Sequence, residues 1–509
     1  MTSACRIGFL VDGLLSRYQV HLFDAVRKAA WQRGAVVVGF PGSYLGGTDS
    51  ERPAFDGSFV YELVSPSSVD GIIVASNLIS SGASATKIRS ICEHEAVPVV
   101  SIGPQPGMTV VDVDNGRGLH QVIDHLVTEH GCRRLALIRG PVTNPDSLER
   151  ERVFRSALQS RGLEVLGDLI VTGNFLESSG AAAVRALFDE RQVSLDELDG
   201  IVAANDQMAT GAMQELAARG IRVPEDLLVV GFDDDDHARS ACPPLTTVAQ
   251  PITQLGEVAV ELLMAKLRGK PPVQGRVLQT LPVLRRSCGC REDQRWQNQS
   301  HASAANLDAF LTQLCALTLQ QLVWFGADKS EADAGVEQLR TYLTGNDLET
   351  ERDSLRQLER IVLDLNTRGV DPLRWQDALV SALHQSVQGV GFDAAQMERM
   401  RSHVERLRQL FAELASVVAR KDQLRTVELA NSLRVVGSAV VCARNFRALG
   451  RVLDAGLPSL DIRYCCVCTF TNVERTRARV AALYHPVVPK PHAQIQSAEQ
   501  LWRSVPPTL

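Results

Sequence analysis

Polar and acidic side chains follow several apolar runs of the sequence, at the point where each run ends. In chain order these side chains are Asp12, Ser76 and Asn77, Asn205 and Asp206, and Asp233 to Asp236. Carboxylates accept hydrogen bonds, and amides both donate and accept them, so the set suits reversible binding of a polar molecule. The same residue types also cap helices and form turns, which is the alternative role for each residue taken singly.

No nucleophile–base pair occurs among these residues, so we expect no catalysis and no cofactor. Cys288 and Cys290 lie one residue apart, beside Arg285 and Arg286. Without a second Cys/His pair near them in the sequence they fall short of zinc-ligand spacing, and we expect no metal.

The elements that would position these side chains are strands alternating with helices over residues 6–282. Apolar runs such as GIIVA (71–75), RLALIR (134–139), GIVAA (200–204) and LLVVGF (227–232) are each followed by a helical pattern. Continuous apolar runs indicate strands buried on both faces, and their alternation with helices predicts doubly wound parallel α/β sheets. Ligands of such sheets bind beyond the carboxyl ends of the strands, where the polar residues lie.

Composition restricts the class of protein further. The 509 residues suggest about three folded units, and 45% hydrophobic with 22% charged residues is typical of a globular chain. A net charge of −6 lacks the basic excess expected of a nucleic-acid-binding domain. We identify no membrane span and no signal peptide, so we expect a cytoplasmic protein whose 11 cysteines are reduced.

One long segment resembles the effector domain of the lactose-repressor family. Residues 202–251 contain NDQMATG, GIRVPEDLLVVGFDD and PPLTTVAQP, which match the family's ordered motifs almost position for position. Residues 114–139 and RERVFRSAL (150–158) match two further segments, with Val153 where the family usually has glycine. The resemblance covers about residues 6–287.

The resemblance implies a periplasmic-binding-protein-like sensor domain over residues 1–290, with two lobes joined by three crossovers and a ligand bound between them. We expect crossovers near Gly140, Gln250 and Pro282, lobe one at about 6–139 and 252–281, and lobe two at about 142–248. The ligand contacts that it implies are Arg150, Asn205, Asp233 and Gln250, and the topology adds Asp12 and Ser76. Asp206 is expected to cap the following helix.

Two departures from related proteins shape the functional expectation. The family's repressors begin with a helix-turn-helix, whereas the first predicted strand here begins near Arg6, so we expect no direct DNA binding. The related periplasmic sugar-binding proteins carry an export signal, which we do not identify. With these two classes of protein set aside, we expect a ligand-sensing module that is connected to a different output.

The carboxyl-terminal part is predicted to relay the signal. A polar linker at 291–304 leads into a helical bundle within 305–430, and Met397, Met400, Val404, Leu407, Phe411, Leu414 and Val418 repeat at heptad spacing over 397–418. This seam is either the core of its own bundle or the contact of a parallel homodimer. A further helix is expected from Ser432 to Asp454.

Residues 431–509 resemble the opening of a GAF-like domain, in GLPSLDIRYCCVCTF (456–470). Cys465, Cys466 and Cys468 are expected to be buried strand residues rather than ligands.

We therefore expect a non-enzymatic, cytoplasmic, dimeric sensor that binds a small polar metabolite, such as a sugar, and transmits lobe closure to a downstream domain or partner. The first alternative is a transcription regulator that acts on DNA through an unrecognised element or a partner. The second alternative is the sensor part of a histidine kinase or diguanylate cyclase that lacks its catalytic end.

Overall fold

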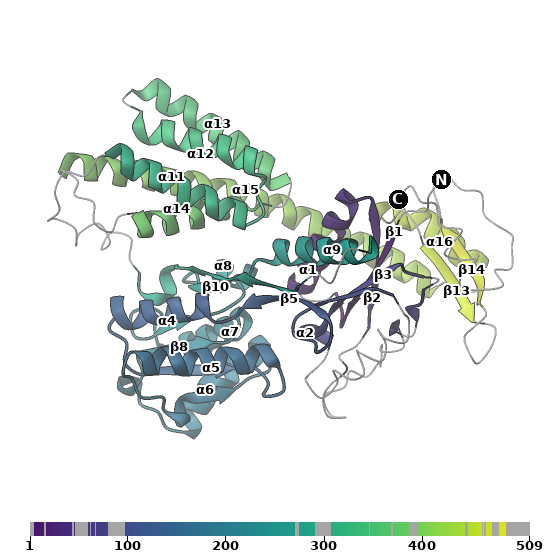
Figure 1. The fold of residues 1–509 in the computed structure, drawn as a ribbon, viewed down its shortest axis with the longest axis horizontal. Coiled ribbons are helices and arrows are strands. Elements are labelled where there is room, and N and C mark those ends of the chain that lie inside the picture. Colours follow the sequence, from purple (N-terminus) through teal and green to yellow (C-terminus); the bar gives the residue numbers. More distant parts are fainter. Residues whose placement is uncertain are drawn as a thin grey trace. The chain divides into compact units, whose positions relative to one another are not determined.

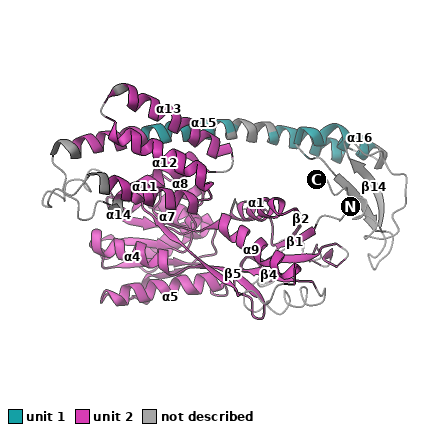
Figure 2. Cartoon of the chain, turned by 45° about the horizontal axis from the view of Figure 1, so that its top comes forward, with its two compact units in different colours: residues 1, 408–509 teal, residues 2–407 magenta. Residues whose placement is uncertain are grey.

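The computed structural model describes residues 5–14, 17–42, 45, 60–61, 63–66, 68–79, 97–269, 274–290, 307–345, 347–367, 370–386, 394–442, 446–460, 462, 465–470 and 478–484. The chain divides into two compact units, Thr2–Leu407 and Arg408–Leu509 with Met1 (Figure 2). In the described part of the chain no helix is both long enough and apolar enough to cross a membrane.

Within the described residues, the first sheet has six parallel strands in the order β11-β5-β4-β3-β1-β2. They are β1 (Cys5–Val11), β2 (Ala35–Pro41), β3 (Gly71–Ala75), β4 (Val99–Ile102), β5 (Thr109–Asp114) and β11 (Arg276–Gln279). Helices α1 (Arg17–Gln32) and α9 (Ile252–Leu267) pack against each other, and their apolar side chains share one buried core with the strands. The short helix α2 (Ser76–Ile79) follows β3 directly. This sheet and these helices form lobe one (Figure 1).

The second sheet has the parallel order β7-β6-β8-β9 in the described residues, and bridges beside β9 add the antiparallel pair β10-β12. Its strands are β6 (Leu135–Arg139), β7 (Ile170–Thr172), β8 (Gly200–Ala203), β9 (Leu228–Val230), β10 (Thr247–Ala249) and β12 (Leu281–Val283). Its helices are α4 (Arg117–Glu129), α5 (Pro145–Ser160), α6 (Glu177–Arg185), α7 (Asp206–Ala218) and α8 (Asp236–Ser240). Two buried cores surround this sheet and make lobe two. The predicted doubly wound parallel α/β architecture is confirmed.

The first crossover lies between β5 and α4, at Asn115 and Gly116, and not near Gly140 as the resemblance implied. Strand β6 pairs with β7 and β8, and Leu119 and Leu126 of α4 share a core with Leu137 of β6. Residues 117–139 therefore belong to lobe two. The expectation was wrong because an apolar strand has the same sequence pattern in either sheet, and the choice depends on which core its side chains enter.

The other two crossovers lie where the strands separate. Gln250 connects β10 in lobe two to α9 in lobe one, and Thr280 connects β11 in lobe one to β12 in lobe two. Thr280 is fully buried, and its hydroxyl donates to the carbonyl oxygen of Asp114 at 2.7 Å, which ties the third crossover to the first.

The helical region of the first unit follows the two-lobed domain. Its helices are α11 (Leu307–Trp324), α12 (Lys329–Thr344), α13 (Leu348–Thr367), α14 (Pro372–Ser386) and the start of α15 (Ala394–Val441). Helix α12 packs on α13 and on α11, and α11 packs on α14, around large buried side chains such as Phe310, Tyr342 and Trp375. The predicted linker at 291–304 lies outside the described residues.

Helix α15 spans 48 residues without a break. The expected start of a new helix at Ser432 is therefore wrong, because polar residues end an apolar seam without ending a helix. Met400, Val404 and Leu407 are buried within the first unit. His403 and Arg406 contact Glu351 of α13 at 3.3 and 3.2 Å, so this part of the seam faces its own bundle.

The second unit contains the remainder of α15, helix α16 (Phe446–Gly456) and the antiparallel strands β13 (Cys465–Phe470) and β14 (Ala478–Tyr484). Leu453 and Leu457 form its buried cluster. The three cysteines predicted on a strand lie in β13. The side chains of that strand, and the rest of the segment that resembles a GAF domain, lie outside the described residues.

Candidate functional site

Arg150 occupies the centre of a buried polar cluster. It lies on α5, which starts at Pro145 after the cap Asn144, whose side-chain oxygen accepts from the Ser147 amide. The guanidinium donates to Asn115 Oδ1 at 2.9 Å and to the carbonyl oxygen of Ala204 at 2.6 Å. It also stacks on the Phe232 ring, with 3.6 Å from Cζ to the ring centroid. The first crossover and the ends of two strands thus meet at one cation.

Asp233 faces this cation and lies three residues after the end of β9 at Val230. Its Oδ1 atom lies 3.5 Å from Arg150 Nη1 and accepts a hydrogen bond from Gln250 Nε2 at 2.6 Å. Burial raises the pKa of the Asp233 carboxyl to about 7, against the opposing pull of the Arg150 charge. Arg150, Asp233 and Gln250 are therefore brought together, and we call them, with Asn115, the ligand cluster.

The backbone at Asp233 is also unusual, with φ of 109°, and Asp234 follows with φ of 56°. Two consecutive non-glycine residues in this region are sterically costly, and such residues occur mostly where the surrounding structure holds them for a purpose. The two residues therefore form a strained corner between the sheet and α8.

Asn205 is engaged in holding the backbone. Its side-chain oxygen caps α7 by accepting from the Met208 amide, and its Nδ2 donates to the carbonyl oxygen of Phe175 at 2.9 Å. Asn205, and not Asp206, is the helix cap. Asp206 is fully buried, and accepts from the Thr247 hydroxyl at 2.6 Å and from the Asp235 amide at 2.9 Å.

Asp12 and Ser76 lie at strand ends of lobe one, as predicted from topology. Gln19 Nε2 donates to Asp12 at 2.9 Å, and burial raises the pKa of Asp12 to about 6. The Ser101 hydroxyl donates to the buried Ser76 hydroxyl at 2.8 Å. These bonds join both residues to their own lobe, and neither bond reaches the ligand cluster.

Three further residues near the ligand cluster, Asn115, Asp146 and Tyr18, were not predicted from the sequence. Asn115 binds both Arg150 and, at 3.0 Å, Asp146 of α5. The charges of Asp146 and Asp233 add to burial in raising the pKa of the Tyr18 hydroxyl on α1 above its usual value. Tyr18 of lobe one therefore lies close enough to lobe two to sense its charges. Asn115 directly follows β5, so the strand-end rule applied earlier would have identified it.

A second charged cluster connects lobe two to α14. The Arg285 guanidinium donates to Asp234 at 2.8 Å and to Asp377 of α14 at 2.7 Å, and Arg374 of α14 also pairs with Asp234. The Asp234 side chain is fully buried. Burial lowers the pKa of Arg374 to about 10, which leaves it charged at neutral pH. We call these four residues the relay cluster.

In comparisons with known proteins, residues 123–288 match the family described as periplasmic binding protein-like domain. The HTH-type transcriptional regulator CelR of Thermobifida fusca is 38% identical over 206 residues, which cover 39% of this chain and 59% of the relative. The HTH-type transcriptional regulator DegA of Bacillus subtilis is 32% identical over 221 residues, covering 43% of this chain and 63% of the relative. The ribose operon repressor of Escherichia coli K12 is 26% identical over 280 residues, covering 55% and 80%.

A solved structure described as a transcriptional regulator CelR–cellobiose complex is similar over 56% of this chain and 86% of that chain, with 29% identity and a TM-score of 0.48. The chain spans less than two thirds of the first two relatives. It contains a periplasmic-binding-protein-like domain similar to that of lactose-repressor-family regulators. These relatives are named as regulators and not as enzymes, which agrees with the expectation that the chain is not an enzyme.

Proposed function

We propose that the chain is a ligand-responsive regulator whose sensor domain binds a small polar metabolite at the ligand cluster and transmits the change to the helical region. The observation that carries the proposal is the adjacency of Asp233 and Asp234. Asp233 belongs to the ligand cluster, and Asp234 belongs to the relay cluster that holds α14. A ligand that moves the first carboxylate also moves the strained backbone that carries the second.

The chemistry of the ligand cluster favours a polyhydroxylated ligand. The planar guanidinium of Arg150 offers donors in a fixed fork, the Asp233 carboxylate accepts from paired hydroxyls, and the Gln250 amide does both. One relative is named for the ribose operon, which supports a sugar within this class.

The helical region contacts both lobes, which makes it a suitable receiver. Trp324 at the end of α11 donates through Nε1 to the carbonyl oxygen of Gln279 in lobe one at 3.3 Å, and its own carbonyl accepts from Gln254 at 3.3 Å. The relay cluster joins α14 to lobe two. A ligand that binds one lobe arrangement more tightly shifts the lobe equilibrium by that difference in affinity, and the region bridging the lobes must respond.

The test is a thermal-shift screen of sugars, nucleosides and amino acids against the full chain. A hit at 100 times its dissociation constant stabilises the sensor domain by about 2.7 kcal/mol. Asp233→Asn should remove this shift, whereas Asp226→Asn, a change on the surface of the same lobe, should leave it intact. Hydrogen exchange of α14 should also change when the hit binds. A hit that stabilises both variants equally would refute the site, and an unchanged α14 would refute the relay.

Regulation of transcription is the second candidate, favoured by the names of the relatives. In this case the output is DNA binding, by the chain or by a partner that it controls. Binding to a labelled promoter pool at two salt concentrations tests it, since phosphate contacts give a steep salt dependence. Ligand-sensitive, salt-dependent DNA retention supports this candidate, and retention equal to that of bovine albumin contradicts direct binding.

A further inference from the structure

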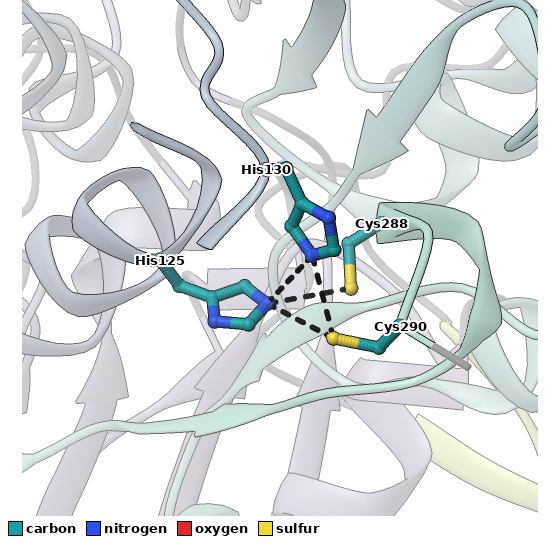
Figure 3. Close-up of side chains that lie close together, drawn as sticks. All are labelled: His125, His130, Cys288 and Cys290. Atoms are coloured by element: carbon teal, nitrogen blue, oxygen red, sulfur yellow. Dashed lines mark hydrogen bonds between the residues drawn. The ribbon is translucent and has the colours of Figure 1, made fainter. Parts of the chain in front are cut away.

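Four metal-ligating side chains converge in lobe two, away from the ligand cluster. His125 lies on α4, His130 ends that helix, and Cys288 and Cys290 flank Gly289 at the carboxyl end of the sensor domain. One atom of each residue, Nε2 or Sγ in the contacts below, lies within 4.8 Å of the other three. Figure 3 shows the two imidazoles and two sulfur atoms directed toward one another.

Four distances within the set are close to those of a tetrahedral site. His125 Nε2 lies 3.2 Å from His130 Nε2, 3.1 Å from Cys290 Sγ and 3.7 Å from Cys288 Sγ, and His130 Nε2 lies 3.4 Å from Cys290 Sγ. Ligands at usual zinc bond lengths and tetrahedral angles are separated by about 3.3 Å for two nitrogens and about 3.6 Å for nitrogen and sulfur. The four distances, from 3.1 to 3.7 Å, are therefore close to the spacing that a single zinc ion requires.

Two members of the set lie in the interior of the domain, since Cys288 is fully buried and His125 is 8% exposed. The Cys288 thiol donates a hydrogen bond to the carbonyl oxygen of Arg285 at 3.2 Å. A thiolate that binds a metal ion has lost this proton, so zinc would replace that hydrogen bond with a bond to the ion.

The backbone is shaped to present both sulfur atoms on one side. Gly289 has φ of +85°, and this left-handed residue turns the chain between the two cysteines. A Cβ added there would lie 3.3 Å from Leu228 and 3.4 Å from His130 Nδ1, against the histidine that completes the set. Glycine is the residue that fits both the turn and the space.

We propose that His125, His130, Cys288 and Cys290 bind one zinc ion. Two nitrogens and two sulfurs in tetrahedral arrangement select zinc among common divalent cations. Binding replaces the two thiol protons, which are released to solvent, so Zn²⁺ with two thiolates and two neutral imidazoles forms a site without net charge. All four positions are taken by protein, so the ion is structural and not catalytic.

The ion would anchor the segment that carries the relay cluster. Arg285 lies three residues before Cys288. A bound ion would join this short segment to α4 through His125 and His130. His125 also lines a cavity of about 440 Å³ shared with Gln321, Trp324 and Asp377. Zinc would thus fix the position of Arg285 between lobe two and α14.

The experiment uses the full chain purified under reducing conditions. Metal content is measured by mass spectrometry, before and after removal with a chelator and return of equimolar zinc, and cobalt is added as a spectroscopic probe. We expect one zinc per chain and, for cobalt, thiolate charge-transfer bands with the intense visible bands of a tetrahedral ion. The double variant Cys288→Ser/Cys290→Ser and His125→Gln should each lose at least tenfold in zinc affinity.

Matched controls separate the site from general thiol and imidazole binding. Cys242→Ser changes an exposed cysteine of the same domain, and His120→Gln changes a more exposed histidine of α4. Both should bind zinc as the unaltered chain does. If the ligand variants fail to fold, X-ray absorption of the unaltered zinc-loaded chain decides, with two sulfur and two nitrogen neighbours expected. Any of three results would overturn the proposal. The unaltered chain could bind zinc no more tightly than the double variant does, or its cobalt spectrum could lack thiolate bands. The third is a Cys288–Cys290 disulfide that persists in reductant.

Discussion

Asp233 and Asp234 are consecutive residues whose carboxylates belong to different ion pairs, the first with Arg150 at 3.5 Å and the second with Arg285 at 2.8 Å. The positive φ at both residues turns the chain so that neighbouring side chains enter separate clusters. One cluster has the chemistry of a ligand site, and the other holds a helix outside the sensor domain. This corner is the shortest covalent path between the two.

The relay cluster predicts the effect of Asp234→Asn. The change leaves Arg285 and Arg374 near each other with one fewer buried counter-charge, so we expect about 3 kcal/mol lower stability of the first unit. Ligand affinity should be largely retained, while ligand-dependent protection of α14 in hydrogen exchange should be lost.

Asp189→Asn is the control, because Asp189 pairs with Arg219 at an exposed surface of the same lobe. It should change stability by less than about 0.5 kcal/mol. Retained α14 protection in Asp234→Asn would show that the signal takes another path.

The raised pKa of Asp233 predicts a specific pH dependence of stability. The folded state keeps this proton up to about pH 7, whereas the unfolded chain releases it near pH 4. The folded state therefore binds more protons between these values, and stability falls as pH rises from about 4 to about 7, by at most about 4 kcal/mol. Above pH 7 this contribution is constant.

Denaturant unfolding at pH 4.5 to 8, at intervals of about half a unit, measures this dependence. Asp233→Asn should flatten the curve, and Asp12→Asn should remove a smaller part of it below about pH 6. A curve for Asp233→Asn that parallels the unaltered protein would mean that Asp233 is ionised throughout, held so by Arg150.

Helix α15 predicts opposite effects for two leucines. Leu407 is fully buried whereas Leu433 is exposed. Leu407→Asp introduces a charge into a packed core and should cost at least about 3 kcal/mol, with loss of helical circular dichroism in the bundle. Leu433→Asp should leave the helix signal unchanged.

Sedimentation of both variants tests the proposed homodimer at the same time. A Leu407→Asp variant that keeps its helix content and falls to half the mass would favour the seam as a dimer contact. Loss of helix content at either mass places Leu407 in the bundle core.

The cysteine turn predicts a selective effect of Gly289→Ala. Alanine at φ of +85° costs about 1–2 kcal/mol and its methyl group presses toward His130. Gly269→Ala is the matched control, since Gly269 has φ of +67° but open space around its Cα. Both variants should be destabilised, and Gly289→Ala alone should weaken zinc binding. Equal zinc affinity in the two variants would contradict the role assigned to this turn.

Local sequence determined the features that depend on neighbouring residues. Continuous apolar runs followed by polar residues identified the strand ends at Asp12, Ser76, Asn205 and Asp233, because a buried strand must stop where a side chain prefers water or a cap. The family motifs added Arg150 and Gln250. The same reasoning applied to the end of β5 would have added Asn115.

Tertiary structure alone decided which of these groups meet. Strand β6 has the pattern of any buried strand, and only the core shared by Leu119 and Leu137 assigns it to lobe two. Asn205 has the right type for a ligand contact, but its two polar atoms are used by the Met208 amide and the Phe175 carbonyl. His125 and Cys290 are 165 residues apart in sequence, yet their side chains lie 3.1 Å apart. The sequence pattern could not predict this contact, because periodicity reports only the local geometry of a helix or strand.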